Sequence, residues 1–185
     1  MNNAITIEDV KDAARQLAGI AVRTKLIEND ILNARTGGRI FIKPECLQRT
    51  GSFKIRGAYN CISRLSDAEK ARGVVAFSSG NHAQGVACAS KMLGVKAVIV
   101  MPTDAPAIKV ANTRGFGAEV IFYDRYSQSR EEIAADISTK QGLSVVPSYD
   151  HPHIIAGQGT AGLEIIEDIQ AMGLSLDAAL FNCGG

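Results

Sequence analysis

Short apolar segments alternate with longer helical segments between residues 73 and 146, and this alternation constrains the fold more than any other feature. Each apolar segment is apolar at successive positions, as a strand covered by helices on both faces of its sheet must be. Strands that alternate with helices of roughly 10 to 15 residues indicate parallel βαβ units. The sequence therefore predicts an α/β fold around a parallel sheet. The expected strands are residues 73–77, 97–101, 118–123 and 143–146.

The segments between these strands have the pattern of helices. Residues 81–93, 105–114 and 127–141 each run directly into a glycine, the residue that most often follows the last turn of a helix. A helix is thus expected after each of the first three strands. This is the order that parallel strands require, because their connection must cross from one end of the sheet to the other.

Capping patterns predict further helices before the sheet. Thr6 is followed three residues later by Asp9, and Ser66 by Glu69, so each pair can form a capping box at the start of a helix. We expect another helix to begin with Ser52 as its N-cap residue, because serine is favoured at that position. These helices would flank the sheet and supply part of its cover.

The remaining elements are expected at the two flanks. A strand is predicted over residues 39–43, a helix from Gly157 or Thr160 to Met172, and a last strand over residues 177–182. That last strand runs into two glycines, a pattern that normally leads into a helix. We therefore expect the sequence to be truncated, although a natural short chain with a frayed end is the alternative.

Charge and hydropathy narrow the classes of partner. The 20 basic and 19 acidic residues leave a net charge of +1, so no basic patch favours nucleic acid or a membrane surface. The longest apolar run, residues 97–101, is far too short to cross a bilayer. The first residues lack the basic and apolar regions of a signal peptide. We expect a cytoplasmic protein whose partners are small molecules or other copies of the chain.

The cysteines and histidines do not predict a metal site. The cysteine spacing does not resemble that of a zinc ribbon, and we expect the thiols to be reduced and to pack as small apolar groups. His151 and His153 flank a proline without a third ligand in reach, so we expect a loop without metal. The cysteines are Cys46, Cys61, Cys88 and Cys183.

The first segment that could carry chemistry is Thr50-Gly-Ser-Phe-Lys-Ile-Arg-Gly57. Lys54 falls in the first turn of a predicted helix, where the helix dipole disfavours a cation. That field and partial burial should lower the pKa of the Lys54 amine and favour the neutral form that a Schiff-base nucleophile needs. The plainer alternative is a solvated surface lysine, because lysines are rarely buried.

The second segment is Ser78-Ser-Gly-Asn-His-Ala-Gln-Gly85, which follows a strand and opens a helix. Its glycines allow the backbone to approach a ligand, and the helix N-terminus offers free N–H donors to an anion. A carboxylate or phosphate site and an ordinary capped turn are about equally favoured on local grounds. Cys183-Gly-Gly185 could begin another anion-binding loop, although by itself it predicts almost nothing.

Three segments occur in a fixed order along the chain: Ser52-Phe-Lys-Ile-Arg-Gly57, Ser78-Ser-Gly-Asn-His-Ala-Gln-Gly85 and Ile155-Ala-Gly-Gln-Gly-Thr160. Together they closely resemble the pyridoxal-phosphate (PLP) enzymes of fold type II, in the branch of serine racemase, threonine dehydratase and threo-3-hydroxyaspartate dehydratase. The resemblance spans nearly the whole chain. It implies a two-lobed, parallel-sheet fold like that of tryptophan synthase β, with an incomplete large lobe.

The resemblance also implies how the chain is divided. Residues 1–65 would form the N-terminal part of the large lobe, residues 66–150 the small α/β lobe, and residues 151–185 the return to the large lobe. The active site would lie between the lobes and close by motion of the small one. The divalent-cation site of many members would lie beyond this chain. A homodimer of the full-length protein is what the family suggests.

The same resemblance assigns residues to the cofactor. Lys54 would form a Schiff base with PLP and move the Cα proton of the substrate. Phe53 would pack beside the cofactor ring, and Asn81 would hydrogen-bond to the PLP 3′-oxygen. Gly184 and Gly185 would begin the glycine-rich loop that grips the PLP phosphate.

The substrate is implied to be a β-hydroxy amino acid such as serine, threonine or 3-hydroxyaspartate, which would lose water and yield a keto acid and ammonia. Ser79, Gly80, Asn81 and His82 would bind its carboxylate, although His82 could equally be a packed structural residue. Ser79 would lie on the face of PLP opposite Lys54, where a hydroxyl can deliver a proton and racemise the substrate. Threonine dehydratases often carry alanine there, so this serine favours serine racemase or hydroxyaspartate dehydratase.

Several rival interpretations stay open. Threonine synthase-like chemistry or β-replacement could use the same scaffold. A non-catalytic binding module is a rival from another class, favoured by the incomplete phosphate loop but disfavoured by intact Lys54, Ser79 and Asn81. A nicotinamide-dependent oxidoreductase is excluded because no G-x-G-x-x-G stands directly after a predicted strand.

Overall fold

A computed structural model describes residues 5–182 and contains a four-stranded parallel sheet. Its strands lie in the order β5-β4-β3-β6, so the chain starts near the middle and builds outward on both sides. The register pairs Val74 with Ala97 and with Ser144. The predicted parallel sheet is confirmed. The strands are β3 (Val74–Phe77), β4 (Ala97–Pro102), β5 (Glu119–Tyr123) and β6 (Ser144–Val145).

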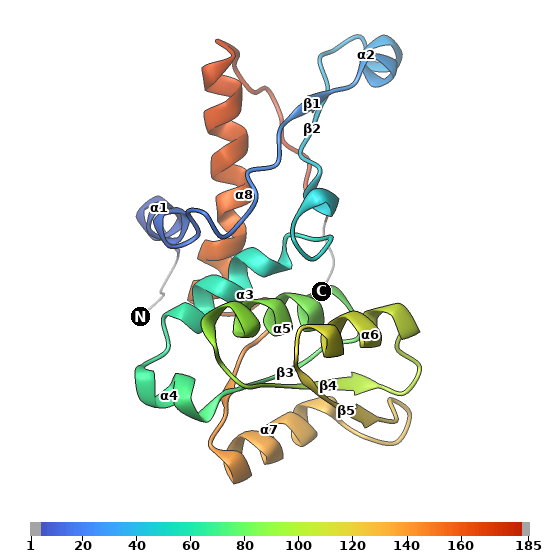
Figure 1. The fold of residues 1–185 in the computed structure, drawn as a ribbon. Helices are drawn as coiled ribbons and strands as arrows, with labels where there is room; N and C mark the ends of the chain where they lie inside the picture. The colour runs from blue at the N-terminus through green and yellow to red at the C-terminus, as the bar shows by residue number, and fades with distance from the viewer. Residues whose placement is uncertain (1–4, 183–185) are drawn as a thin grey trace.

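Helices cover both faces of this sheet (Figure 1). Helices α5 (Asn81–Leu93) and α6 (Ala107–Gly115) lie on one face, and α7 (Arg130–Gln141) lies on the other. Alternate residues of β4 follow the two faces: Ile99 packs into the core under α5, whereas Val98 packs into the core under α7. Every residue of β4 is buried, which explains its unbroken apolar sequence.

The helices of this unit begin and end much as the sequence predicts. The Ser66–Glu69 capping box opens α4 (Asp67–Arg72), and Ser129 caps α7 by accepting the Glu132 N–H. Helix α5 ends at Gly94, whose φ of 67° is the left-handed conformation that glycine adopts without strain.

A second layer of helices packs on the outer side of α5. Helix α3 (Lys54–Ser63) lies between α5 and α8 (Pro152–Ala171). A Cβ added to Gly85 of α5 would come within 3.0 Å of the Lys54 carbonyl carbon. A Cβ added to Gly157 of α8 would come within 2.7 Å of the Gly57 Cα. Helix α3 is therefore packed between α5 and α8, and at each of the two crossings a glycine lets the main chains come close together.

The N-terminal segment extends along α8 to its far end (Figure 1). The Thr6–Asp9 capping box opens α1 (Ile7–Gln16), as predicted. Beyond it, β1 (Ile27–Glu28) pairs antiparallel with β2 (Phe41–Ile42), and α2 (Asp30–Thr36) connects them. The expected strand over residues 39–43 is therefore present in shortened form. A 3₁₀ turn, Glu45–Leu47, then leads toward α3.

Two predictions about helix starts are wrong. Phe53, and not Ser52, is the N-cap residue of α3; Phe53 has helical φ and ψ and makes no side-chain cap. Helix α8 begins at Pro152, five residues before the earlier of its two predicted starts. Proline is favoured in the first turn of a helix because its missing N–H has no partner there, and His151 supplies the side-chain cap.

The predicted strand over residues 177–182 is also wrong. These residues, all within the described part of the chain, adopt no regular structure. Leu180 is 98% exposed and Phe181 is 68% exposed. A strand needs a neighbour for its N–H and C=O groups, and the described sheet pairs no strand with this segment. The apolar pattern of the sequence does not show whether a neighbouring strand is present.

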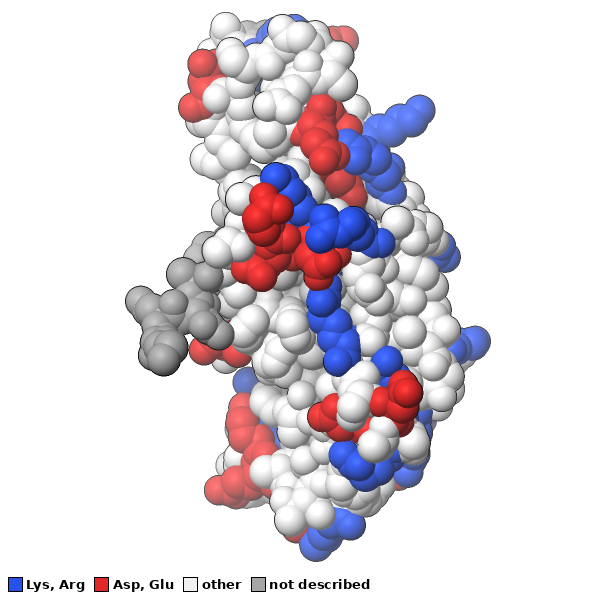
Figure 2. Space-filling model, turned by 90° about the vertical axis from the view of Figure 1, so that its left-hand side faces the viewer, with Lys and Arg blue, Asp and Glu red and all other residues white. Residues whose placement is uncertain are grey.

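Acidic and basic side chains lie next to one another over the surface (Figure 2). This interspersion agrees with the nearly balanced net charge of the sequence. Among the described helices, none is both long enough and apolar enough to cross a membrane.

Candidate active site

Lys54 is the first residue of α3, and its backbone is the point at which α5 makes its closest approach. A Cβ on Gly85 would lie 3.0 Å from the Lys54 carbonyl carbon and 3.1 Å from its oxygen. Contacts this short are tighter than most real Cβ contacts, so a larger residue at this crossing would displace the Lys54 main chain by a few tenths of an ångström. The last glycine of the Ser78–Gly85 segment thereby fixes the main chain of Lys54 against the start of α5.

The Lys54 amine is partly buried. Its Nζ donates a hydrogen bond of 2.6 Å to the Ser148 carbonyl and lies 5.2 Å from the centroid of the Phe53 ring. Burial lowers the pKa of the Lys54 amine below its ordinary value. The shift is in the direction that the sequence predicts, and it raises the fraction of neutral, nucleophilic amine.

His82, in the first turn of α5, is buried with only 3% exposure. Its Nε2 lies 3.0 Å from the Val146 carbonyl. Burial lowers the pKa of His82 to about 4, and the nearby charge of Lys54 acts in the same direction. His82 thus contacts the Val146 carbonyl and Lys54 the Ser148 carbonyl, two residues further on. The start of α5 and the lysine amine therefore lie against the same short segment after β6.

The hydrogen bond of His82 determines its tautomer. A carbonyl can only accept, so Nε2 carries the proton, and in the neutral ring Nδ1 is then an acceptor. Nδ1 is buried and has no partner in the described residues. An acceptor does not bind a carboxylate. We therefore expect the ring of His82 to orient the turn, and its backbone N–H to serve an anion.

The N-terminus of α5 is open to a ligand. Its N-cap residue, Gly80, supplies no side-chain cap, and a Cβ added there would meet no atom within 4 Å. The neighbouring Ser79 and Asn81 are at least partly exposed. The first N–H groups of a helix have no intrahelical partner, so this turn can donate to an anion.

These residues fit a carbonyl cofactor such as PLP. Lys54 offers an amine with a lowered pKa, and Phe53 presents a 40% exposed ring beside it. Four buried polar atoms of the 50–57 and 78–85 segments lack partners within the described residues: Thr50 Oγ1, Ser52 Oγ, His82 Nδ1 and Gln84 Nε2. Such atoms are costly unless something supplies the missing hydrogen bond. Gly184 and Gly185, the predicted start of the phosphate loop, lie outside the described residues.

No group of three or more His, Cys, Asp or Glu side chains in residues 5–182 could hold a metal ion. The rings of His151 and His153 have centroids 5.4 Å apart at the start of α8. His151 caps this helix by accepting the His153 N–H at 3.2 Å. The pair is thus part of a helix start, and not of a loop as the sequence suggested.

A surface hollow lies elsewhere, between α1, α3 and the start of α8. It is lined by Asp9, Asp12, Asn60, Arg64 and His153, among others. Neither Lys54 nor the 78–85 turn lines it. The candidate site is therefore located by the contacts of Lys54 and of the 78–85 turn, and not by the size of a cavity.

Sequence reasoning missed a buried ionic cluster two residues beyond Lys54. Arg56 is completely buried, and its guanidinium contacts Glu45 at 2.8 Å and Glu164 at 2.7 Å. It also donates to Thr160 at 3.1 Å and to the Val22 carbonyl. The one local sign in the sequence is that Arg56 stands next to Ile55 and Gly57, which are buried residues of the same helix.

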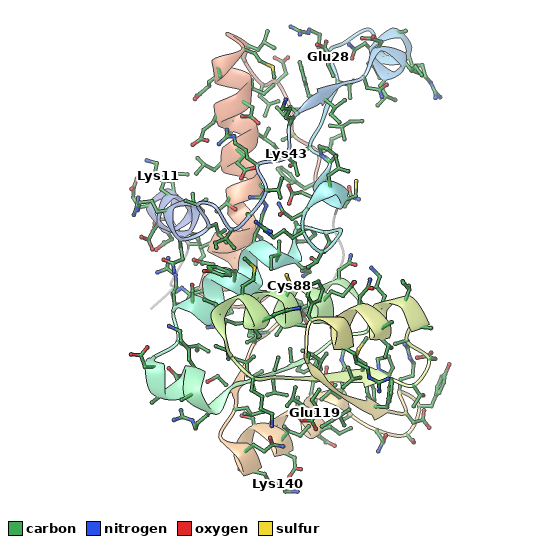
Figure 3. The ribbon with its side chains drawn as sticks, viewed as in Figure 1. Lys11, Glu28, Lys43, Cys88, Glu119 and Lys140 are labelled. Carbon is green, nitrogen blue, oxygen red and sulfur yellow. The ribbon has the colours of Figure 1, made fainter. Side chains whose placement is uncertain are left out.

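A second basic residue extends this cluster along α8. Lys43, labelled in Figure 3, is nearly buried. Its Nζ lies 2.7 Å from Glu164 Oε2 and 3.7 Å from Asp168 Oδ2. Arg23 contacts Asp168 on the exposed side. We call the group of Lys43, Glu45, Arg56 and Glu164 the ionic cluster. It joins the N-terminal segment, α3 and α8.

The cluster and the helix crossing explain the Ile155–Thr160 segment. Gly157 lies against Gly57, and Thr160 contacts Arg56. Gly159 faces Val10 of α1, where an added Cβ would come within 3.0 Å. Gly157 and Thr160 therefore allow α3 to pack closely on α8, and this packing helps to place Lys54 at the start of α3. Gly159 allows α1 to pack against α8.

A parallel sheet with a partly buried lysine amine beside an open helix N-terminus defines a class of α/β enzymes that hold a carbonyl cofactor covalently. The chain belongs to the family of pyridoxal-phosphate dependent enzymes, whose family model matches residues 17–185. Its fold is that of fold type II. The match covers both Lys54 and the 78–85 turn.

Similar proteins carry names within the branch that the sequence motifs suggest. The chain is 52% identical over 177 residues to an L-threo-3-hydroxyaspartate ammonia-lyase of Pseudomonas sp, covering 96% of this chain and 54% of that protein. It is 44% identical over 180 residues to serine racemase of Schizosaccharomyces pombe, covering 97% of this chain and 54% of that protein. The chain thus spans about half the length of these curated relatives.

Solved structures agree with this assignment. Maize serine racemase superposes with a TM-score of 0.87 at 38% identity, covering 90% of this chain and 51% of that one. A threonine deaminase from T.th. superposes with a TM-score of 0.84 at 44% identity, covering 92% of this chain and 54% of that one. The fold of the described residues is therefore that of about half of such an enzyme.

Proposed function

We propose that the protein catalyses PLP-dependent β-elimination on a β-hydroxy amino acid such as serine, threonine or 3-hydroxyaspartate. The products would be a keto acid and ammonia. The observation that carries this proposal is the partly buried Lys54 amine, with its lowered pKa, beside the open N-terminus of α5. The names of the similar ammonia-lyases and of serine racemase support it.

When bound, PLP supplies an electron sink that acidifies the Cα–H bond of the substrate. In the proposal, Lys54 would hold the cofactor, and its neutral amine would take the Cα proton of the substrate as a general base. Phe53, next to the amine, would keep water from that face. The Cα–H and Cβ–O bonds break and water leaves, and hydrolysis of the unsaturated amine gives the keto acid and ammonia.

The N-terminus of α5 would hold the substrate carboxylate. The N–H groups of its first turn, beginning with Asn81 and His82, favour a negative charge, whereas the Gly80 N–H already donates to Ser78 Oγ. Buried His82 keeps this turn in place by bonding the Val146 carbonyl. Binding through main-chain groups would orient the substrate while it leaves the Ser79 hydroxyl free.

Racemisation is a second proposed activity at the same site. Ser79 is partly exposed at the turn that follows β3, so its hydroxyl is accessible to a substrate. A hydroxyl facing Cα from the side opposite Lys54 can return a proton there and invert the configuration. Ser79→Ala should abolish racemisation while elimination of L-serine largely continues. Chiral analysis of recovered serine measures the first rate, and pyruvate release the second; retained racemisation would refute this role.

The main proposal is tested by removing the lysine. Lys54→Ala should abolish the absorbance near the visible edge that wild-type protein gains with PLP. Borohydride reduction of the wild type should fix the cofactor to the peptide that contains Lys54, as read by mass spectrometry. Lys11→Ala, which removes an exposed lysine paired with Glu8, is the matched control and should behave as wild type.

Outcomes of this experiment also separate the rivals. A persistent absorbance band in Lys54→Ala would discredit the lysine assignment. A cofactor spectrum without turnover would favour a binding module. Product analysis with serine, threonine and 3-hydroxyaspartate distinguishes elimination from threonine synthase-like chemistry and β-replacement.

Other features of the whole protein remain proposals that rest on the family. These are the division into residues 1–65, 66–150 and 151–185, the homodimer, the cytoplasmic location and a divalent-cation site. One structural fact bears on the division. The first boundary would assign α3 to one lobe and α5 to the other, although these helices meet backbone to backbone at Lys54 and Gly85.

A further inference from the structure

Two polar contacts run in parallel along the seam between α5 and α6. Lys109 Nζ lies 2.7 Å from Asn81 Oδ1, and Asn112 Nδ2 lies 3.0 Å from Gln84 Oε1. The partners are three residues apart on each helix, so the contacts lie one turn apart on facing surfaces. The first of them involves the first residue of α5, at the open helix end described above.

The Lys109 contact determines how the Asn81 amide is turned. An ammonium group has three donors and no acceptor, so it can only face the oxygen of an amide. If the amide were flipped, its NH₂ group would face the ammonium and the hydrogen bond would be lost. With Asn81 Oδ1 held by Lys109, both amide donors point away from the ammonium.

Lys109 is itself held in place by α6. Thr113, one turn later, is completely buried, and its hydroxyl donates to the Lys109 carbonyl at 2.8 Å. The Asn112–Gln84 contact keeps α6 against α5 at the next turn. Asn81 also lies four residues before Gly85, on the helix face that meets the backbone of Lys54.

We propose that Lys109 is a positioning residue that orients the Asn81 amide, so that its NH₂ group donates to an oxygen of the ligand at Lys54. This proposal deepens the proposed function and rests on it: the ligand oxygen would be the ionised 3′-oxygen of PLP. Lys109 need not touch the cofactor. Its role is to keep the donor side of Asn81 from rotating toward α6.

The orientation is measured first without cofactor, by the ¹⁵N–¹H signals of the Asn81 side-chain amide. Wild-type protein should give one ordered NH₂ pair, with slow rotation and contacts to α5. Lys109→Met should broaden or shift that pair, because the methionine chain fills the same space but donates nothing. Lys109→Arg should restore it, because a guanidinium also only donates.

Asn112→Ala is the matched control, since it breaks the second seam contact and leaves the first. It should leave the Asn81 signals near those of wild type. Equal changes in Lys109→Met and Asn112→Ala would mean that helix packing, and not the ammonium, orders the amide. Unchanged Asn81 signals in Lys109→Met would overturn the proposal outright, whatever the cofactor does.

The second measurement adds PLP. Lys109→Met should weaken PLP binding by about two- to tenfold, the effect of one hydrogen bond, and lower the ratio of long- to short-wavelength absorbance of the bound cofactor. In an Asn81→Ala background the Lys109 change should have no further effect on this ratio. An equal effect in both backgrounds would refute the link. Failure of wild type to bind PLP would instead count against the proposed function, and the amide measurement would still stand.

Discussion

The sheet unit and the ionic cluster are both buried, but they are held together by different forces. Around Ile99 and Val98 the core is apolar on both faces of the sheet. Around Arg56 the buried groups are charged, and Glu45 and Glu164 form salt bridges with its completely buried guanidinium. Helix α3, which begins with Lys54, lies between the two regions.

The difference teaches how each region responds to change. Apolar burial is non-directional, so a lost methyl group costs stability but leaves its neighbours satisfied. A buried ion pair depends on both partners, because a charge left alone in the interior is strongly unfavourable. We therefore expect the ionic cluster to be the more brittle of the two and the one that responds to pH.

The largest effect is expected from Arg56→Ala. It removes the guanidinium that Glu45 and Glu164 share, so that Glu164 keeps only Lys43 and Glu45 keeps only the Thr24 hydroxyl. The loss of this largely buried pairing should lower the free energy of unfolding by about 3–5 kcal/mol. Urea titration followed by circular dichroism measures this loss. Arg15→Ala, which breaks only an exposed pair with Asp12, is the control and should cost less than about 1 kcal/mol. Equal losses in the two variants would remove the distinction between the regions.

A smaller effect is expected at the crossing of α3 and α8. Gly157→Ala would place a Cβ 2.7 Å from the Gly57 Cα and 2.8 Å from the Arg56 carbonyl oxygen, so a backbone must move. We expect a loss of about 1–3 kcal/mol from this overpacking. Gly162→Ala in the same helix meets nothing within 4 Å. It should stabilise the protein by about 0.5–1 kcal/mol, because alanine favours helix.

The smallest effect is a pH dependence that sharpens the comparison. Burial by itself raises the pKa of Glu45, but the hydrogen bond and charge of Arg56 outweigh it and hold the pKa below its ordinary value of 4.5. A folded pKa below the unfolded one gives stability that is present above about pH 4.5 and is lost as pH falls through the folded pKa. Unfolding free energies of wild type should therefore decline on acidification.

Two variants test the source of that decline. Glu45→Gln should flatten the part of the acid slope that comes from this carboxyl group, whereas Ile99→Ala should be less stable at every pH with the slope of wild type. A Glu45→Gln curve parallel to that of wild type would contradict the assignment. Parallel slopes for Ile99→Ala are required if the apolar region is indifferent to pH.

The regions also differ in how far the sequence could predict them. The strands and helices around Ile99 follow from periodicity and capping residues that lie close together in the chain, and Ser66 and Gly94 mark helix ends where the structure has them. The ionic cluster could not be predicted, because Arg56 meets Glu164 only after the chain has folded across more than a hundred residues. A lone arginine in a helix gives no sign of that partner.

Within the candidate site the division is similar. The lowered pKa of Lys54 was predicted from a helix start and partial burial, and burial is the cause in the structure. The hydrogen bond of Lys54 to Ser148 could not be predicted, because it depends on where β6 ends. The failed strand at residues 177–182 shows the same limit, since an apolar run predicts burial without naming what covers it. The early start of α8 could have been predicted from Pro152, because proline is favoured in the first turn of a helix.

The contact between Gly85 and Lys54 has a mechanical consequence. Only a hydrogen atom separates α5 from the peptide group that carries the lysine, so no side chain there can rotate aside to absorb displacement. A tilt or slide of α5 would be transmitted directly to the main chain of Lys54. The position of the Lys54 amine would therefore change with the position of the sheet on which α5 packs.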